Sequence, residues 1–145
     1  MKETNELLEN IYEDAEMASY TLTILLKELK NKDNKIKGDV EDILKEYEKY
    51  TKEAKALLKK HKIKPEKTSM MARLGAKEGI KANIKKDNSD SKISDIVIQG
   101  LVMRIIDITK KIDSFDKEAN KDIVQFANKL LKFQEESVEK LKEYL

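Results

Sequence analysis

The chain has 145 residues, of which 40% are charged and 39% hydrophobic, with four glycines, one proline and a net charge of +2. This length suits one domain, and so few turn-forming residues argue against an all-β fold, which needs a turn about every 8–12 residues. The lack of cysteine excludes disulfides, thiolate metal sites and cysteine catalysis, and the single histidine, His61, excludes a site built on two imidazoles from one chain. No apolar run approaches the ~18 residues of a membrane span, and the first ten residues lack the apolar core of a signal peptide, so we expect a cytoplasmic protein.

The small net charge hides a strong asymmetry along the chain. Residues 1–30 carry three Lys against seven Asp or Glu, a balance of −4, whereas residues 55–86 carry eleven Lys or Arg against two Glu, a balance of +9. Such polarity can dock one copy of a protein onto another or attract an anionic surface, and it can also belong to a solvated exterior.

The first half of the chain contains two long segments with helical periodicity. Apolar residues three and four apart predict a helix over residues 4–30, with Thr4 as its N-cap, and a second helix over residues 36–61. His61 ends the inner stripe of that second helix, where the helix dipole favours a cation-capable side chain. We expect a structural role for His61, and ligation of a metal or a haem is the alternative.

A shorter, basic helix is predicted over residues 69–86. Its basic stripe, in which charged side chains recur every fourth residue, consists of Arg73, Lys77, Lys81 and Lys85. The opposite side is small and contains Ala72, Gly75, Ala76, Gly79 and Ala82. We expect this small side to seat the helix on the rest of the domain. The basic stripe then lies in solvent, or meets an anionic membrane surface or an acidic partner. We expect no nucleic acid, because the segment offers no aromatic side chain for base stacking.

Two further helices are predicted at the C-terminal end, over residues 92–113 and 116–144. The first is rich in β-branched residues, which also suit a strand, but its polar residues gather on one side at about 100° per residue and favour a helix. Asp116 is the expected N-cap of the second.

Four long amphipathic helices with short connections predict an all-α, antiparallel four-helix bundle, in which residues 69–86 form a crossover between two helical hairpins. The order of the segments resembles that of small uncharacterised ferritin-like proteins of low-GC Gram-positive bacteria. The resemblance spans nearly all of residues 1–145 as one domain, and it is carried by the segments NELLENIYEDAEMASYTLTILLKEL, ILKEYEKYTKEAKALLKKH, SMMARLGAKEGIKANI, DIVIQGLVMRIIDITK and VQFANKLLKFQEESVEKLKEYL. It implies the ferritin-like fold and a bacterial source, and it implies no activity.

The sequence lacks the residues of a ferritin-like metal centre. Such centres use a Glu from each of two helices and a Glu-x-x-His from each of the other two, and Glu-x-x-His occurs nowhere in this chain. We therefore expect no metal, no cofactor and no enzymatic activity. A non-standard carboxylate site that binds metal is the alternative.

Buried tyrosines are a possible ligand site. Tyr12, Tyr47 and Tyr50 fall on inner stripes together with Gln134 and Ser137. These groups could form a polar pocket, but we expect the two polar side chains of the last helix to satisfy the phenol hydroxyls.

Secondary apolar stripes indicate further contacts. Met17, Tyr20 and Ile24 form one such stripe on the first helix, and Met103 lies beside Gln99 on the opposite side of the 92–113 helix from its core. These residues predict contact with the crossover helix or with another subunit. Together the patterns favour a non-enzymatic structural or interaction module that forms a homo-oligomer, with metal binding or docking to an anionic partner as alternatives.

Overall fold

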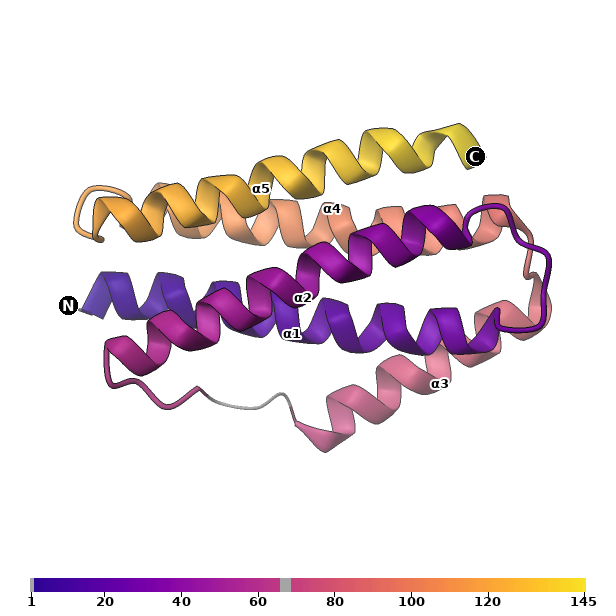
Figure 1. The fold of residues 1–145 in the computed structure, drawn as a ribbon, viewed down its shortest axis with the longest axis horizontal. Coiled ribbons are helices and arrows are strands. Elements are labelled where there is room, and N and C mark those ends of the chain that lie inside the picture. Colours follow the sequence, from indigo (N-terminus) through magenta and orange to yellow (C-terminus); the bar gives the residue numbers. More distant parts are fainter. Residues whose placement is uncertain (1, 66–68) are drawn as a thin grey trace.

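The computed structural model describes residues 2–65 and 69–145, and every regular element in that part of the chain is helical. The helices are α1 (Lys2–Glu28), α2 (Lys37–Lys60), α3 (Met70–Lys86), α4 (Asp90–Phe115) and α5 (Lys121–Leu141), followed by a short 3-10 turn, η1 (Lys142–Tyr144). The predicted all-α fold class is confirmed. Figure 1 shows α1 and α2 as one antiparallel pair and α4 and α5 as another, with α3 leading back along α1 toward the start of α4.

Two predicted helix starts are wrong. Thr4 is not an N-cap, because α1 already begins at Lys2; its buried hydroxyl instead accepts a hydrogen bond from the backbone N–H of Asn120, at 2.8 Å. Asp116 is likewise no N-cap. It is the helical C-cap of α4, which runs on to Phe115, and α5 begins only at Lys121. Residue type alone identified Asp116; in the structure a turn that contains the buried Ala119 separates it from α5.

The core is centred on α1, which contacts each of the other four long helices. Its buried positions recur at three and four residues and extend around more than one side of the helix, as a helix with several neighbours requires. The fully buried aliphatic residues of α1 include Leu7, Leu8, Ile11, Ala15 and Leu25. Burial of each large side chain contributes about 1.5–3 kcal/mol relative to exposure, so these residues stabilise both helical pairs at once.

Aromatic residues join α2 to α5. The Tyr47 ring meets Phe133 edge-on at a centroid distance of 5.1 Å, and Tyr50 stacks on Phe133 at 5.6 Å. The buried Tyr47 hydroxyl donates to the side-chain oxygen of Gln134 at 2.8 Å, so the predicted partner of this phenol is confirmed. Ser137 does not take part, because its hydroxyl donates to the carbonyl of Phe133 within its own helix.

The crossover helix, α3, does not pack on α1 through the side that the sequence predicted. Its buried or half-buried side chains are Arg73, Ala76, Lys77, Ile80 and Ile84, which form one stripe toward α1. The expectation that the small side seats α3 is wrong: Ala72, Gly75, Gly79 and Ala82 are exposed, and a Cβ added at either glycine would meet nothing within 4 Å. On this side Arg73 and Lys81 of α3 pair with Glu16 and Glu28 of α1.

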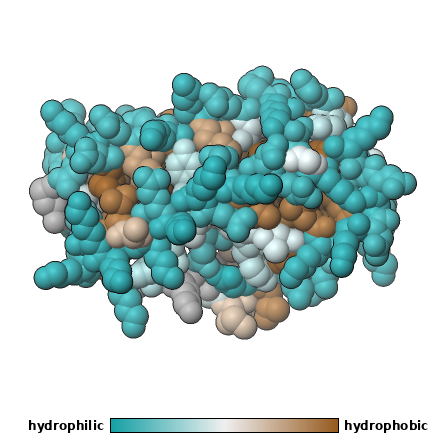
Figure 2. Space-filling model, viewed as in Figure 1, coloured by the Kyte–Doolittle hydropathy of each residue, from teal (hydrophilic) through white to brown (hydrophobic). Residues whose placement is uncertain are grey.

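The surface is mostly hydrophilic but has apolar regions. Figure 2 shows that the face on which α2 lies is covered mostly by hydrophilic side chains, whereas apolar side chains reach the surface at the N-terminal end of α3. Met70, Met71 and Leu74 are exposed there. None of the described helices is long and apolar enough to cross a membrane.

Candidate functional site

The contact between α1 and α3 brings together two features that the sequence placed on separate surfaces. The Arg73 guanidinium of α3 forms an ion pair with Glu16 of α1 and lies over the Tyr20 ring, 4.8 Å from its centroid. The Tyr20 hydroxyl donates to the Arg73 carbonyl at 3.4 Å. Farther along, Lys81 lies 3.9 Å from Glu28. Part of the charge asymmetry of the chain is therefore compensated within one molecule.

The remaining members of the basic stripe have different surroundings. Lys77 is half-buried, and Lys85 is exposed near the end of α3. Since Arg73 and Lys81 already face carboxylates of α1, only part of the predicted anion-binding surface is open to a partner.

The five predicted interface residues fall on two helices. On α1, Ile24 is buried, Met17 is half-buried and Tyr20 contacts α3, while Gln99 and Met103 are exposed on α4. Val102 and Ile106 lie beside Met103 and are also exposed, and the sequence reasoning did not single them out as interface residues. Steps of three and four from Gln99 to Val102 and Ile106 are the signal that identifies them.

Polar side chains also lie where α1 meets α4. The Asn10 amide donates to the Asp107 carboxylate at 2.9 Å, and Asp14 lies near Asp107 and Arg104. Burial raises the pKa of Asp14 to about 7, against the attraction of the Arg104 guanidinium, which lowers it. The carboxyl is therefore largely neutral in slightly acidic solution, and its Oδ2 atom is buried with no hydrogen-bond partner among the described residues.

These carboxylates are not arranged as a metal centre. Within residues 2–65 and 69–145, no group of three or more His, Cys, Asp or Glu side chains is placed to hold a metal ion. His61, the other residue weighed as a ligand, is the half-buried C-cap of α2. Asp14 and Asp107 therefore lie near each other without forming such a group.

A cavity of about 290 Å³ lies between α1, α3 and α4, with Tyr47 of α2 also in its wall. Leu22, Ile80 and Leu101 give it a largely apolar lining, and Arg104 contributes the only charged side chain among the lining residues. The sequence reasoning missed Arg104. Its signal is a lone arginine inside the apolar run Val102-Met103-Arg104-Ile105-Ile106.

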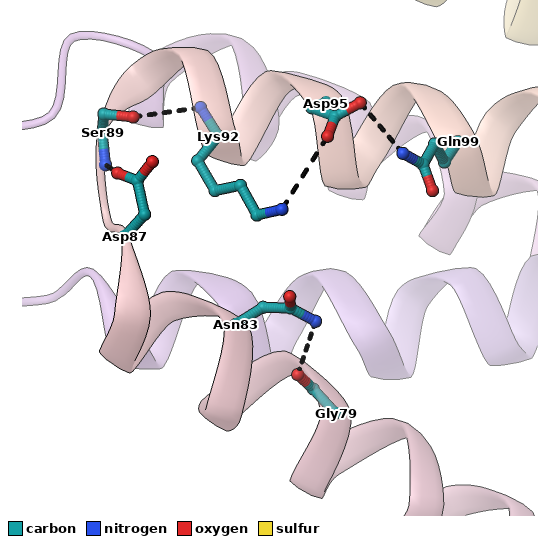
Figure 3. A network of polar contacts seen from close by, with 7 residues as sticks. All are labelled: Gly79, Asn83, Asp87, Ser89, Lys92, Asp95 and Gln99. Atoms are coloured by element: carbon teal, nitrogen blue, oxygen red, sulfur yellow. Dashed lines mark hydrogen bonds and ion pairs between the residues drawn. The ribbon is translucent and has the colours of Figure 1, made fainter.

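Polar contacts hold the turn between α3 and α4 and the neighbouring turn of α3 (Figure 3). The Ser89 hydroxyl accepts from the Lys92 N–H at 3.1 Å and caps α4, while the Asp87 carboxylate accepts from the Ser89 N–H at 2.9 Å. On the α3 side, the Asn83 amide donates to the Gly79 carbonyl at 2.9 Å, and both residues line the cavity. Two of these contacts thus cap the start of α4, and the third brings together two lining residues of α3.

No protein-family model, curated protein or solved structure matches this chain. The resemblance to small ferritin-like proteins therefore stays a prediction, and any function has to be argued from the geometry above.

Proposed function

We propose that this protein is a non-enzymatic interaction module that forms a homodimer through the outer face of α4. The observation that carries the proposal is the exposure of Val102 (40%), Met103 (72%) and Ile106 (50%) next to one another in the middle of that helix. A contiguous apolar patch on a surface otherwise rich in charge is typical of a protein contact.

The spacing of this face suits a second helix. Residues 92, 95, 99, 102, 106, 109 and 113 follow one another at alternating steps of three and four, the repeat with which two helices pack side by side. Gln99, Val102, Ile106, Thr109 and Asp113 on this row are exposed, and Met103 and Lys110 flank it. We call the seven residues of this row, together with Met103 and Lys110, the outer row of α4.

A second copy of the same helix is the partner that the charges favour. If two copies of α4 run antiparallel about a two-fold axis between Val102 and Met103, each Asp95 meets a Lys110 and each Lys92 meets an Asp113. In such an isologous contact every pair occurs twice, so one sequence supplies four opposite-charge pairs around an apolar centre. Lys92 and Asp95 lie 3.9 Å apart within one chain, so both side chains are already on the same side of α4.

Sedimentation equilibrium tests this proposal. We expect a dimer for the unmodified chain and a monomer for the double variant Met103→Glu, Ile106→Glu, because carboxylates at the centre of the contact would lose water without gaining a partner. Ala56→Glu is the control, since Ala56 is exposed on α2 and its replacement adds one carboxylate outside the proposed contact.

The charge pairing gives a sharper test of the geometry. Asp95→Lys should weaken the dimer, and the exchange Asp95→Lys with Lys110→Asp should restore it. A dimer that survives Met103→Glu, Ile106→Glu, or an unmodified chain that is monomeric at the highest attainable concentration, would overturn the proposal.

We further propose that the arrangement belongs to the ferritin-like class of four-helix bundles in a bacterial, cytoplasmic protein. Two antiparallel helical pairs and a connecting α3 that leads back along α1 support this reading (Figure 1). A crystal structure in which α1, α2, α4 and α5 superpose on a ferritin-like bundle in the same order and direction would establish it.

A further inference from the structure

We infer that the cavity between α1, α3 and α4 binds a small amphiphilic carboxylic acid, with the carboxylate on Arg104 and the apolar body between the three helices. This inference is independent of the homodimer, because the cavity lining contains none of the outer row of α4.

The size of the cavity limits the ligand. Its volume of about 290 Å³ is at the low end of the range for small-molecule sites, which is about 300–1,000 Å³. Its apolar walls come from Leu22 and Leu25 of α1, Ile80 of α3, and Ile96 and Leu101 of α4. A single short acyl chain or one small ring suits such a space, and a nucleotide or a peptide does not.

Arg104 determines the charge of the ligand. Its guanidinium is permanently cationic and carries five N–H donors, of which Nη1 donates to the Gly100 carbonyl at 3.1 Å. Among the described residues, no carboxylate oxygen lies within the 4.0 Å of an ion pair with it, in contrast to Arg73 on the neighbouring helix. A half-buried arginine with spare donors beside an apolar cavity is suited to a carboxylate, which it can bind through two hydrogen bonds.

Gly100 keeps that guanidinium in place. A Cβ at this position would lie 3.1 Å from the Nη1 atom of Arg104, whereas a Cβ at Gly75 or Gly79 would meet nothing. The absence of a side chain at residue 100 thus lets the guanidinium lie against the backbone at the cavity wall.

The Asp14 carboxyl does not cancel this charge at pH 6. Asp14 interacts with Arg104, but burial raises the pKa of its carboxyl to about 7, so at pH 6 most of the carboxyl is protonated. Asp107, whose carboxylate accepts from the Asn10 amide at 2.9 Å, is not among the residues that line the cavity. At that pH the lining therefore presents the positive charge of Arg104 to an incoming anion.

Three eight-carbon probes of different charge test the inference at pH 6: octanoate, octanol and octylammonium, each titrated into ¹⁵N-labelled protein. The four glycines of the chain provide internal reporters, because Gly79 and Gly100 line the cavity and Gly38 and Gly75 do not. We expect octanoate to shift the amide signals of Gly79 and Gly100 only, with an affinity at least about tenfold above that of octanol. Octylammonium should not bind.

Two variants distinguish the contribution of the head-group contact with Arg104 from that of the space in the cavity. Arg104→Met should remove the tenfold preference for octanoate and leave octanol binding unchanged, which also shows that the variant is folded. Gly79→Phe should block octanoate and octanol, whereas Gly75→Phe, an equally exposed site on α3 outside the lining, should not.

The opposite results would overturn the inference. Equal affinities for octanoate and octanol, an octanoate affinity insensitive to Arg104→Met, or shifts at Gly38 and Gly75 as large as those at Gly79 and Gly100 would each exclude an acid-binding site here. So would the absence of any shift with octanoate.

Discussion

The hydroxyl of Thr4, in the first turn of α1, accepts a hydrogen bond from the backbone N–H of Asn120, 116 residues later, at 2.8 Å. Thr4 is 1% exposed, and Asn120 is the N-cap of α5, whose own side chain makes no capping bond. The bond therefore attaches the connection between α4 and α5 to the start of α1.

Thr4→Val should lower the free energy of unfolding by about 1–3 kcal/mol, because it keeps the shape of the side chain but leaves the Asn120 N–H without its acceptor. Urea unfolding followed by circular dichroism measures this. Thr23→Val is the control: it makes the same change on the same helix, but the Thr23 hydroxyl donates only to Ser19 in the preceding turn, so we expect a change near zero. Equal losses in the two variants would contradict the assignment.

Gly75→Ala should raise the free energy of unfolding by about 0.5–1 kcal/mol. Glycine inside a helix costs about that much relative to alanine, and the new methyl group would meet nothing. Thermal and urea unfolding report the gain. Gly100→Ala gives the contrast, because its methyl group would displace the Arg104 guanidinium, and we expect a smaller gain or a loss.

Asp14→Asn should stabilise the protein at pH 8 and have little effect near pH 4. Burial raises the pKa of Asp14 from 3.8 to about 7 in the folded chain, against the attraction of Arg104 and together with repulsion from Asp107 and Glu13. Its contribution to stability is thus complete below pH 3.8 and is lost as the pH rises through 7. The shift corresponds to at most about 4 kcal/mol.

Unfolding in urea at several pH values measures this dependence. The effect of Asp39→Asn on stability should have the opposite pH dependence, because hydrogen bonds from Tyr144 and Lys140 lower the pKa of Asp39. Its stabilising effect is present at neutral pH and disappears in acid, so Asp39→Asn should destabilise the protein at pH 7 but not at pH 2. A parallel pH profile for the two variants would refute both assignments.

The Arg73–Glu16 pair should show a coupling of about 1 kcal/mol or more in a double-mutant cycle with Arg73→Leu and Glu16→Gln. Both side chains are mostly buried, at 23% and 19% exposed, so water screens their attraction less than at the surface. The Lys132–Glu136 pair, at 79% and 67% exposed, should give about 0.5 kcal/mol or less. Amide hydrogen exchange in α3 should quicken in both single variants; unchanged exchange would show that α3 is held by other contacts.

Periodicity in the sequence predicted the helical segments because each long helix buries a stripe against its neighbours. It also predicted the α3 segment as a helix but gave the wrong orientation, because few apolar residues of α3 are buried and Arg73 and Lys81 pair with Glu16 and Glu28, carboxylates far away in the sequence. No local pattern in residues 69–86 contains that information. The same segment shows how a small-residue side can be exposed when charge complementarity favours the other side.

The sequence predicted part of one candidate site and none of the other. Met103 and Gln99 could be placed on an outer face from the pattern of α4 alone. The cavity could not be predicted, because its walls come from four helices and its volume depends on how far α3 stands from α4. Arg104 becomes notable only when its neighbours are known to be apolar and its guanidinium to lack a carboxylate among the described residues.

Each of the two helical pairs is made of helices that follow one another closely, either directly through a turn, as α4 and α5 do, or through the eight residues 29–36 between α1 and α2. Contacts between such neighbours close short loops and form early, whereas bringing the pairs together requires the longer loop that contains α3. We therefore expect folding to proceed by rapid formation of two hairpins followed by their docking, with the bond between Thr4 and Asn120 made in the last step.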